Sequence, residues 1–425
     1  MNVTTSAQSE HRPRGKLRYA AAMVLTMVLI PMAVEICWNG IVAYYVVENP
    51  EVALRLSPSN AAAIITTADE SFQSARETKQ QIDTKSMQLD VERALVSDPL
   101  NAAGIRLMGQ LNDGPIAEKF MERAVELSKR EAVAVGWLAD YKRIGHDYVA
   151  SLEYVDLLLR GQPSYVPVLA DLLTAMMEVP ATRQATFDVL SSNPPWAVQF
   201  LPLAMQRVRE PETVIALAAQ FQRHGGALAA NVTQSYIHRL VEEAKYDLAY
   251  ETWRRLLTPR ELEDLKFLFN GDFQFLPTGG EFDWALWGGQ NVTVSTSVST
   301  ITDTTRALKL DYNGGLTSAH SVLQGFRAPP GKYKFSGKVN GNLSGRRGHE
   351  WRVTCFTTGA LIGQSPVIHG SVSGWQDFGF TFTIPEKDCS LQRVQLTLDT
   401  RSLTDKFVSG TIMYRQLVVS PELGR

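Results

Sequence analysis

The chain has few cysteines and almost no net charge. Its 425 residues include three cysteines, and 42 lysines and arginines nearly balance 44 aspartates and glutamates, which leaves a formal net charge of −2. Proteins that bind nucleic acids along a surface carry a basic patch interleaved with aromatic side chains, and the sequence has no such patch. Nucleic acid is therefore not expected as a partner.

Short catalytic and metal-binding motifs are missing as well. The sequence contains no HExxH, GxSxG, CxxC or glycine-rich phosphate loop. The seven histidines are scattered along the chain. We therefore predict a protein that is not an enzyme and that uses no metal ion or cofactor.

A long uncharged run occurs near the N-terminus. Four basic residues between positions 12 and 18 precede an uncharged stretch over 19–34, and its extension to position 38 gives about the 20 residues that cross a bilayer. Basic flanks stay cytoplasmic, so we predict a cytoplasmic tail over 1–17, a single-pass transmembrane signal-anchor over 18–40, and a periplasmic body on a bacterial inner membrane. A cleaved signal peptide is the rival interpretation, although a small-x-small cleavage site is hard to find.

Two similar segments indicate internal repeats. "VALRLSPSNAAAI" and "RALVSDPLNAAGI" align with an offset of 41 residues, and Pro58 and Asn60 in the first copy match Pro99 and Asn101 in the second. Proline cannot continue a helix and asparagine caps the start of one. Each copy is therefore predicted to end one helix, turn, and begin the next.

Helix pairs of this kind extend over the first half of the chain. "AEKFMERAV" (117–125) and "LAYETWRRLL" (248–257) place a small residue, a large residue and another small or apolar residue on one helical face, which lets two helices approach closely. These residues resemble tetratricopeptide repeats over roughly 50–257, with irregular spacing. The resemblance implies an irregular α-solenoid, which we place at 48–262, and binding of envelope assembly or export proteins on its surface.

After position 268 the hydrophobic pattern changes to strict alternation. "GKYKFSGKV", "DFGFTFTIP" and "QRVQLTLD" each place apolar residues on one side and polar residues on the other. Strands with one apolar face, separated by glycine, proline and asparagine turns, predict an antiparallel β-sandwich over 263–425. Cys355 and Cys389 both fall in this region, and a disulfide between them and two separate buried thiols are equally compatible with their spacing.

Five motifs of this region occur in a characteristic order. "NGDFQF…FDWALW", "GKYKFSG", "WRVTC", "GWQDFGFTFTIP" and "SGTIMYRQLVVSP" resemble the strands of jelly-roll, galactose-binding-like carbohydrate-binding modules over 269–421. The resemblance implies a sandwich that binds sugar, and it implies a calcium site with a carboxylate in the first strand. Gln274 stands where that carboxylate is common, so calcium is not expected unless Asp272 and Asp283 substitute for it.

Four residues are candidates for sugar binding. Trp287 stands beside two glycines and is predicted to be exposed, as stacking on a sugar ring requires. Arg352, Gln395 and Asp399 lie on the polar sides of strands and are predicted to line a groove, and the alternative is an ordinary solvated sheet face. The other tryptophans of the region, Trp284, Trp351 and Trp375, are expected to be buried.

These observations lead to one main hypothesis and one alternative. The main hypothesis is a non-enzymatic, membrane-anchored envelope protein that binds an exported polysaccharide through its β-sandwich and binds assembly or export partners through its helical repeats. The alternative is a purely structural scaffold between envelope proteins that binds no sugar. A glycan-modifying enzyme would require two carboxylates that face each other across a groove.

Overall fold

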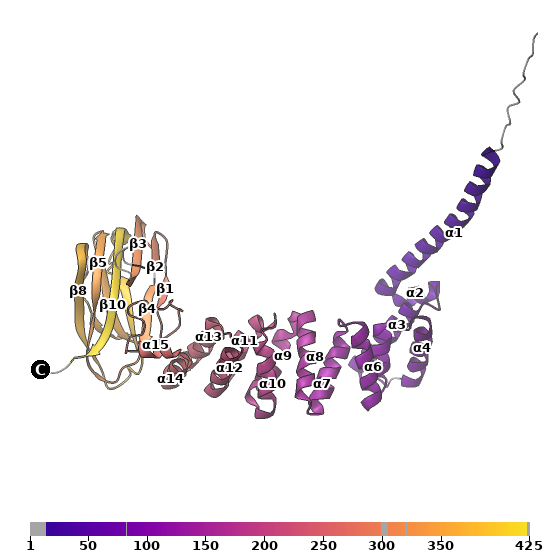
Figure 1. Ribbon diagram of the computed structural model, residues 1–425, viewed down its shortest axis with the longest axis horizontal. Coiled ribbons are helices and arrows are strands. Elements are labelled where there is room, and N and C mark those ends of the chain that lie inside the picture. Colours follow the sequence, from indigo (N-terminus) through magenta and orange to yellow (C-terminus); the bar gives the residue numbers. More distant parts are fainter. Residues whose placement is uncertain (1–13, 82, 299–304, 319–320, 423–425) are drawn as a thin grey trace, which may run out of the picture. The chain divides into compact units, whose positions relative to one another are not determined.

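The computed structural model describes residues 14–81, 83–298, 305–318 and 321–422. The chain divides into two compact units, Met1–Pro163 and Ser164–Arg425, and each is described by itself. Figure 1 shows the helices and strands and labels most of them. The second unit holds helices as well as all the labelled strands, a division that the sequence had not indicated. The domain limits proposed above stay predictions.

The described part of the first unit is helical throughout. Consecutive helices contact each other along the chain, as in an α-solenoid. Their bounds are α1 Arg14–Glu48, α2 Pro50–Leu56, α3 Ala61–Thr78, α4 Thr84–Ser97, α5 Ala102–Gln110, α6 Gly114–Leu127, α7 Ala132–Ile144 and α8 Tyr148–Gly161.

The two repeated segments fold as predicted. In the first copy α2 ends before the turn, and the side-chain oxygen of Asn60 accepts a hydrogen bond of 2.9 Å from the main-chain N–H of Ala63. In the second copy α4 ends before the turn, and Asn101 caps α5 in the same way through the N–H of Gly104, at 3.1 Å. The caps satisfy main-chain donors that a helix start leaves without partners, and the prediction of a helix end, a turn and a helix start is confirmed.

Over Leu25–Glu48, helix α1 is long and apolar enough to cross a membrane. A signal sequence near the N-terminus has the same length and composition. The large apolar side chains of α1 from Leu25 to Ile41 are about half exposed or more. At Val42 the pattern changes, since this side chain is 2% exposed and packs with Ala53 and Ala63 of the following helices. The last turns of α1 therefore belong to the folded body of the first unit.

The second unit begins with helices. A 3₁₀ turn over Pro163–Tyr165 leads into them, and they are α9 Val166–Glu178, α10 Pro180–Ser191, α11 Ala197–Met205, α12 Pro211–Arg223, α13 Ala230–Glu242, α14 Tyr246–Leu256 and α15 Pro259–Glu263.

The strands of the second unit form two antiparallel sheets. Sheet A has the order β1-β4-β9-β6-β7 and sheet B the order β2-β3-β10-β5-β8. Such crossing between sheets is typical of a jelly roll, and the predicted antiparallel sandwich is confirmed. The strands are β1 Ala285–Trp287, β2 Val292–Val298, β3 Arg306–Leu316, β4 Ser321–Phe326, β5 Gly331–Ser344, β6 His349–Cys355, β7 Leu361–Gln364, β8 Gly370–Ile384, β9 Gln392–Leu398 and β10 Phe407–Pro421.

Aromatic side chains fill the space between the two sheets. Trp284 and Trp351 are both 0% exposed, and their ring centroids lie 6.1 Å apart in an edge-to-face arrangement. Phe335 of sheet B lies 5.3 Å from Trp351. Edge-to-face and tilted ring pairs are the favoured geometry for aromatic groups in a core. The structure also joins Cys355 at the end of β6 to Cys389 by a disulfide, with their Cα atoms 4.9 Å apart.

Trp375 is a correction to the sequence analysis, because it is half-buried on the outside of sheet B. Its ring stacks with the guanidinium of Arg415, whose Cζ lies 4.1 Å from the ring centroid. The pairing of β8 with β5 is irregular between Val372 and Gln376, and Gly374 within this stretch has a φ of 70°. This irregular stretch does not change the side that Trp375 faces. Phe378, Phe380 and Phe382 face the core, and Trp375 lies three residues before Phe378, so strict alternation assigns it to the outside.

A cluster of aromatic rings joins the last helices to the sandwich within the second unit. The ring of Trp253 in α14 lies 5.4 Å from those of Phe269 and Phe282, and Tyr250 lies 5.2 Å from Phe282. On the other side, the buried amide of Gln324 in β4 donates to the main-chain oxygens of Phe269 and Phe282, at 3.0 and 3.1 Å. The segment before β1 is thus held between a helix and a strand.

Candidate functional site

Polar side chains cover the outer side of sheet A. In β9, Val394 and Leu396 are buried at 0% and 1% exposure, and side chains alternate along a strand, so the residues between them face outward. The same alternation holds in β6 on either side of Trp351. We call the resulting surface the polar face; it consists of Trp287, Glu350, Arg352, Arg393, Gln395, Thr397 and Asp399.

Strand register brings the predicted sugar-binding residues onto this one face. Gln395 and Arg352 are direct neighbours across β9 and β6. Trp287 is on β1, which β4 separates from β9. Ala285 of β1 pairs with Leu323 of β4, and Leu323 pairs with Gln395 of β9, so these three residues face the same side of the sheet. Trp287 lies two residues after Ala285 and therefore faces that side as well. Because adjacent strands are about 5 Å apart, the Cα of Trp287 lies roughly 10 Å from β9.

A tight turn after β1 presents Trp287 to solvent. Its side chain is 59% exposed, in contrast to Trp284 three residues earlier. The N–H of Gly289 donates to the main-chain oxygen of Val292, at 3.0 Å, and closes the turn. A Cβ atom on Gly288 would lie 2.8 Å from that same oxygen, so no other residue fits there without a shift of the chain. The two glycines noted in the sequence thus fix the position of the tryptophan.

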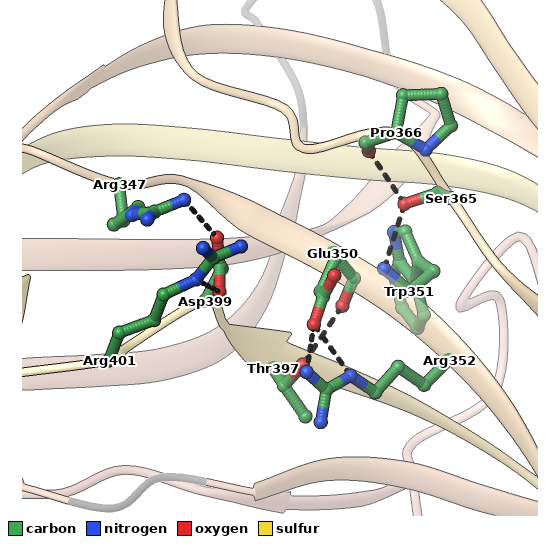
Figure 2. A network of polar contacts seen from close by, with 9 residues as sticks. All are labelled: Arg347, Glu350, Trp351, Arg352, Ser365, Pro366, Thr397, Asp399 and Arg401. Carbon is green, nitrogen blue, oxygen red and sulfur yellow. Dashed lines mark hydrogen bonds and ion pairs between the residues drawn. The ribbon is translucent and has the colours of Figure 1, made fainter. Parts of the chain in front are cut away.

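Glu350 is a nearly buried carboxylate in the middle of the polar face. It is 5% exposed, and Arg352 donates from Nε to its Oε1 at 2.6 Å (Figure 2). The hydroxyl of Thr397 donates to the main-chain oxygen of Glu350, at 3.3 Å. A buried carboxylate needs such a partner, and the pair holds the guanidinium of Arg352 beside Glu350. Arg352 keeps further N–H groups that a ligand can use.

Asp399 organises two arginines at the far end of β9. Its Oδ2 accepts from Nη1 of Arg347 at 2.9 Å, and Nε of Arg401 lies 3.8 Å from its Oδ1 (Figure 2). The carboxylate is only 9% exposed. Asp399 is therefore placed to hold these arginines, and its arginine partners are more accessible to a ligand than its own oxygens are.

The turn after Asp399 is held by a second carboxylate. Oδ2 of Asp405 accepts from the main-chain N–H groups of Arg401 and Ser402, at 3.0 and 2.9 Å. These donors, that of Arg401 above all, hold the pKa of Asp405 below its usual range. The loop that carries Arg401 is thereby fixed beside the polar face.

Three members of the polar face, Glu350, Arg393 and Thr397, were not among the candidates taken from the sequence. Glu350 precedes Trp351 and Arg393 precedes Val394, so both occupy positions that the same alternation assigns to the outer side. The pattern in "QRVQLTLD" contained the signal for Arg393. Nothing in the sequence indicated that Glu350 would be nearly buried, because that depends on the guanidinium of Arg352 covering it.

The residues considered for calcium do not fit a metal site. Asp283 is 2% exposed, and its two oxygens accept from the N–H of Thr278 at 2.7 Å and from the N–H of Trp284 at 2.7 Å. Burial raises the pKa of Asp283, which opposes the charged form that a cation needs. Within the described residues, no group of three or more histidine, cysteine, aspartate or glutamate side chains is arranged to hold a metal ion.

Comparison with known proteins gives matches in structure alone. No protein-family profile and no curated protein sequence matches the chain. Solved structures that match are a family 4 carbohydrate-binding module (15% identity, 36% of this chain and 99% of that chain, TM-score 0.28) and a family 61 module in complex with β-1,4-galactotriose (16%, 37% and 99%, TM-score 0.26). A family 16 carbohydrate-binding module also matches (17%, 36% and 99%, TM-score 0.26). Identities and scores this low carry no conclusion about function.

Proposed function

We propose that the protein is a non-enzymatic polysaccharide-binding protein, and that the polar face of sheet A is its binding surface. The observation that carries the proposal is the position of Trp287, 59% exposed on the same side of the sheet as Arg352 and Gln395. A flat aromatic ring packs on the C–H face of a pyranose, and nearby polar groups bond its hydroxyls. Both kinds of group are present here on one face of the same sheet.

The polar face supports binding better than hydrolysis. A glycosidase needs two carboxylates free to act on the bond between them. Here Glu350 is held by Arg352, and Asp399 is held by Arg347, with Arg401 close by. Carboxylates engaged in this way orient neighbouring donors, which is what a binding surface requires.

The remaining parts suit a protein of the cell envelope. Helix α1 supports a single-pass anchor with a cytoplasmic N-terminus and a periplasmic body on a bacterial inner membrane, because basic residues precede its apolar stretch. The helices are proposed to act as tetratricopeptide-like repeats that bind assembly or export proteins. A groove of about 820 Å³ between α2, α3 and α4 supports this, because its lining includes the apolar Leu54, Ile64 and Met87, which suit the apolar face of a partner helix.

The test is a titration of the full-length protein in zwitterionic detergent micelles, since glycoside detergents would compete for the site. Isothermal titration against a panel of neutral and acidic bacterial glycans should give saturable binding with at least one of them. Trp287→Ala should raise the Kd of that glycan about tenfold or more, as expected for an aromatic anchor. Trp375→Ala removes a half-buried tryptophan from sheet B and should leave the Kd unchanged. A folded protein that binds no glycan of the panel would refute the proposal.

A protein scaffold without sugar binding is the second candidate, and the groove in the first unit favours it. The two candidates differ in the role of Trp287, which contacts a glycan in the first and has no ligand in the second. Crosslinking in cells should recover the same protein partners from the wild type and from Trp287→Ala if the sandwich only supports the helices. Loss of partners after enzymatic removal of the envelope glycan would instead favour the polysaccharide-binding function.

A further inference from the structure

Arg393 differs from the other arginines of the polar face in how it is held. Its Cζ lies 4.5 Å from the ring centroid of Phe356, the residue that follows β6. Phe356 also contacts a helix: its ring centroid lies 6.0 Å from that of Tyr246, the first residue of α14, at an interplanar angle of 70°. Both rings are half-buried. The guanidinium therefore rests on an aromatic support that the sandwich and the helices build together.

The charge of Arg393 has no partner of opposite sign. Arg352 pairs with Glu350, and Arg347 pairs with Asp399. Over residues 14–81, 83–298, 305–318 and 321–422, by contrast, no carboxylate lies within ion-pair distance of Arg393. The cation–π contact orients the planar guanidinium through its face and uses none of its five N–H donors. An oriented guanidinium with free donors is suited to bind a carboxylate through two parallel hydrogen bonds.

Arg393 is continuous with the rest of the polar face. It lies on the outer side of β9 two residues before Gln395 and four before Thr397, which faces Glu350. At about 3.3 Å per residue, Arg393 is roughly 13 Å along the strand from Thr397. A single sugar cannot cover that distance and contact both positions, whereas one oligosaccharide chain can.

We propose that Arg393, supported by Phe356 and Tyr246, forms an end subsite for a carboxylate-bearing sugar, so that the ligand of the polar face is an acidic, uronate-containing polysaccharide. The inference rests on the proposed function and narrows its ligand class. Arg393 touches the carboxylate, and Tyr246 is a positioning residue that acts through Phe356.

The first experiment needs no variant. Full-length protein in zwitterionic micelles is titrated with uronate polymers, namely polygalacturonate and alginate, and with the same polymers after reduction of their carboxyl groups to alcohols. At least one acidic polymer should bind, and its reduced form should bind roughly 10- to 100-fold more weakly, as expected for the loss of a charge-assisted contact. Binding of the acidic polymer should also weaken as NaCl rises from about 50 to about 500 mM, since salt screens an accessible ion pair.

Variants then locate the effect. Arg393→Gln should remove most of the preference for the acidic over the reduced polymer, and Arg393→Lys should restore only part of it, because lysine lacks the planar fork. Arg415→Gln is the matched control: that guanidinium also stacks on an aromatic ring, Trp375, but on sheet B. It should leave the preference unchanged. Tyr246→Ala should reduce the preference, and Tyr246→Phe, which keeps the ring, should restore it.

The outcomes distinguish the acidic subsite from polysaccharide binding in general. Equal affinity for acidic and reduced polymers, binding of neutral glycans only, or a preference that survives Arg393→Gln would overturn the acidic subsite while leaving polysaccharide binding intact. No binding of any glycan would overturn both. If Arg393→Gln fails to fold, the carboxyl-reduction and salt experiments on the wild type decide the question.

Discussion

Replacing Trp253 by alanine should loosen the contact between helix α14 and the sandwich. Truncation of a fully buried tryptophan to alanine lowers the free energy of unfolding by about 3–5 kcal/mol. Trp253 is half-buried, with ring contacts to Phe269 and Phe282 at 5.4 Å and to Tyr250 at 5.6 Å. We therefore expect Trp253→Ala to lower the local stability by about 2 kcal/mol, which corresponds to an opening equilibrium about 30-fold more favourable in this part of the fold.

Native-state hydrogen exchange measures that opening directly. In Trp253→Ala, the amides of α14 and of residues 268–284 should exchange about 30-fold faster than in the wild type, while those of β5 and β10 in the sandwich interior should change little. A double-mutant cycle with Phe282→Ala should show a coupling energy of about 1 kcal/mol, as aromatic pairs do.

The control for the cycle is Trp196→Ala, which removes a buried tryptophan elsewhere in the second unit. Its ring packs on Phe200 of α11, at 5.7 Å. The effects of Trp196→Ala and Phe282→Ala should add within about 0.5 kcal/mol. If Trp253→Ala and Phe282→Ala are equally additive, or if exchange in α14 does not change, the aromatic cluster does not join the helices to the sandwich.

Two further perturbations have defined expectations. Cys355→Ser opens the disulfide that closes a loop of 34 residues, and the loop length predicts a loss of about 4 kcal/mol in the free energy of unfolding of the sandwich; calorimetry that shows an unchanged Tm would contradict it. His238 in α13 bonds Glu281 at 2.7 Å, and this hydrogen bond raises the pKa of His238 above 6.5. The pair therefore stabilises the fold fully below pH 6.5 and loses its effect as pH rises through the raised pKa. Because His238 is more than half exposed, the effect should stay below about 1 kcal/mol. Between about pH 5.5 and about pH 8.5, the Tm of His238→Gln should fall less than the Tm of the wild type. An equal fall in both proteins would show that the His238–Glu281 pair does not cause it.

Local patterns in the sequence predicted local structure well. The Asn60 and Asn101 caps follow from a signal within four residues, and the outward direction of Arg352 and Gln395 follows from the two-residue period of a strand. These features needed no knowledge of distant residues, so the sequence was sufficient. The same rule places Trp375 on the outside of sheet B, because it lies three residues before the core-facing Phe378, so the expectation that it is buried was wrong.

Contacts between distant segments were not predictable in this way. Trp253 has the spacing of a residue between two helices, yet its ring contacts Phe282 in the segment before β1. Phe356 contacts Tyr246, 110 positions earlier, and nothing near either residue indicates the other. The direct interpretation of Trp253 as a helix-packing residue omitted its second role, because periodicity specifies which face is apolar and not what covers that face.

Helix α14 connects the two proposals, since it carries Tyr246 at its start and Trp253 two turns later. If the aromatic cluster around Trp253 fixes α14 on the sandwich, then Trp253→Ala should disturb Tyr246 and, through Phe356, the orientation of Arg393. Trp287 is on β1, and its exposure is set by the turn at Gly288. We therefore expect Trp253→Ala to reduce the preference for acidic over carboxyl-reduced polymer while the reduced polymer binds as it does to the wild type. An equal loss for both polymers would mean that the substitution damages the whole polar face, and no loss for either would mean that Arg393 needs no support from the helix.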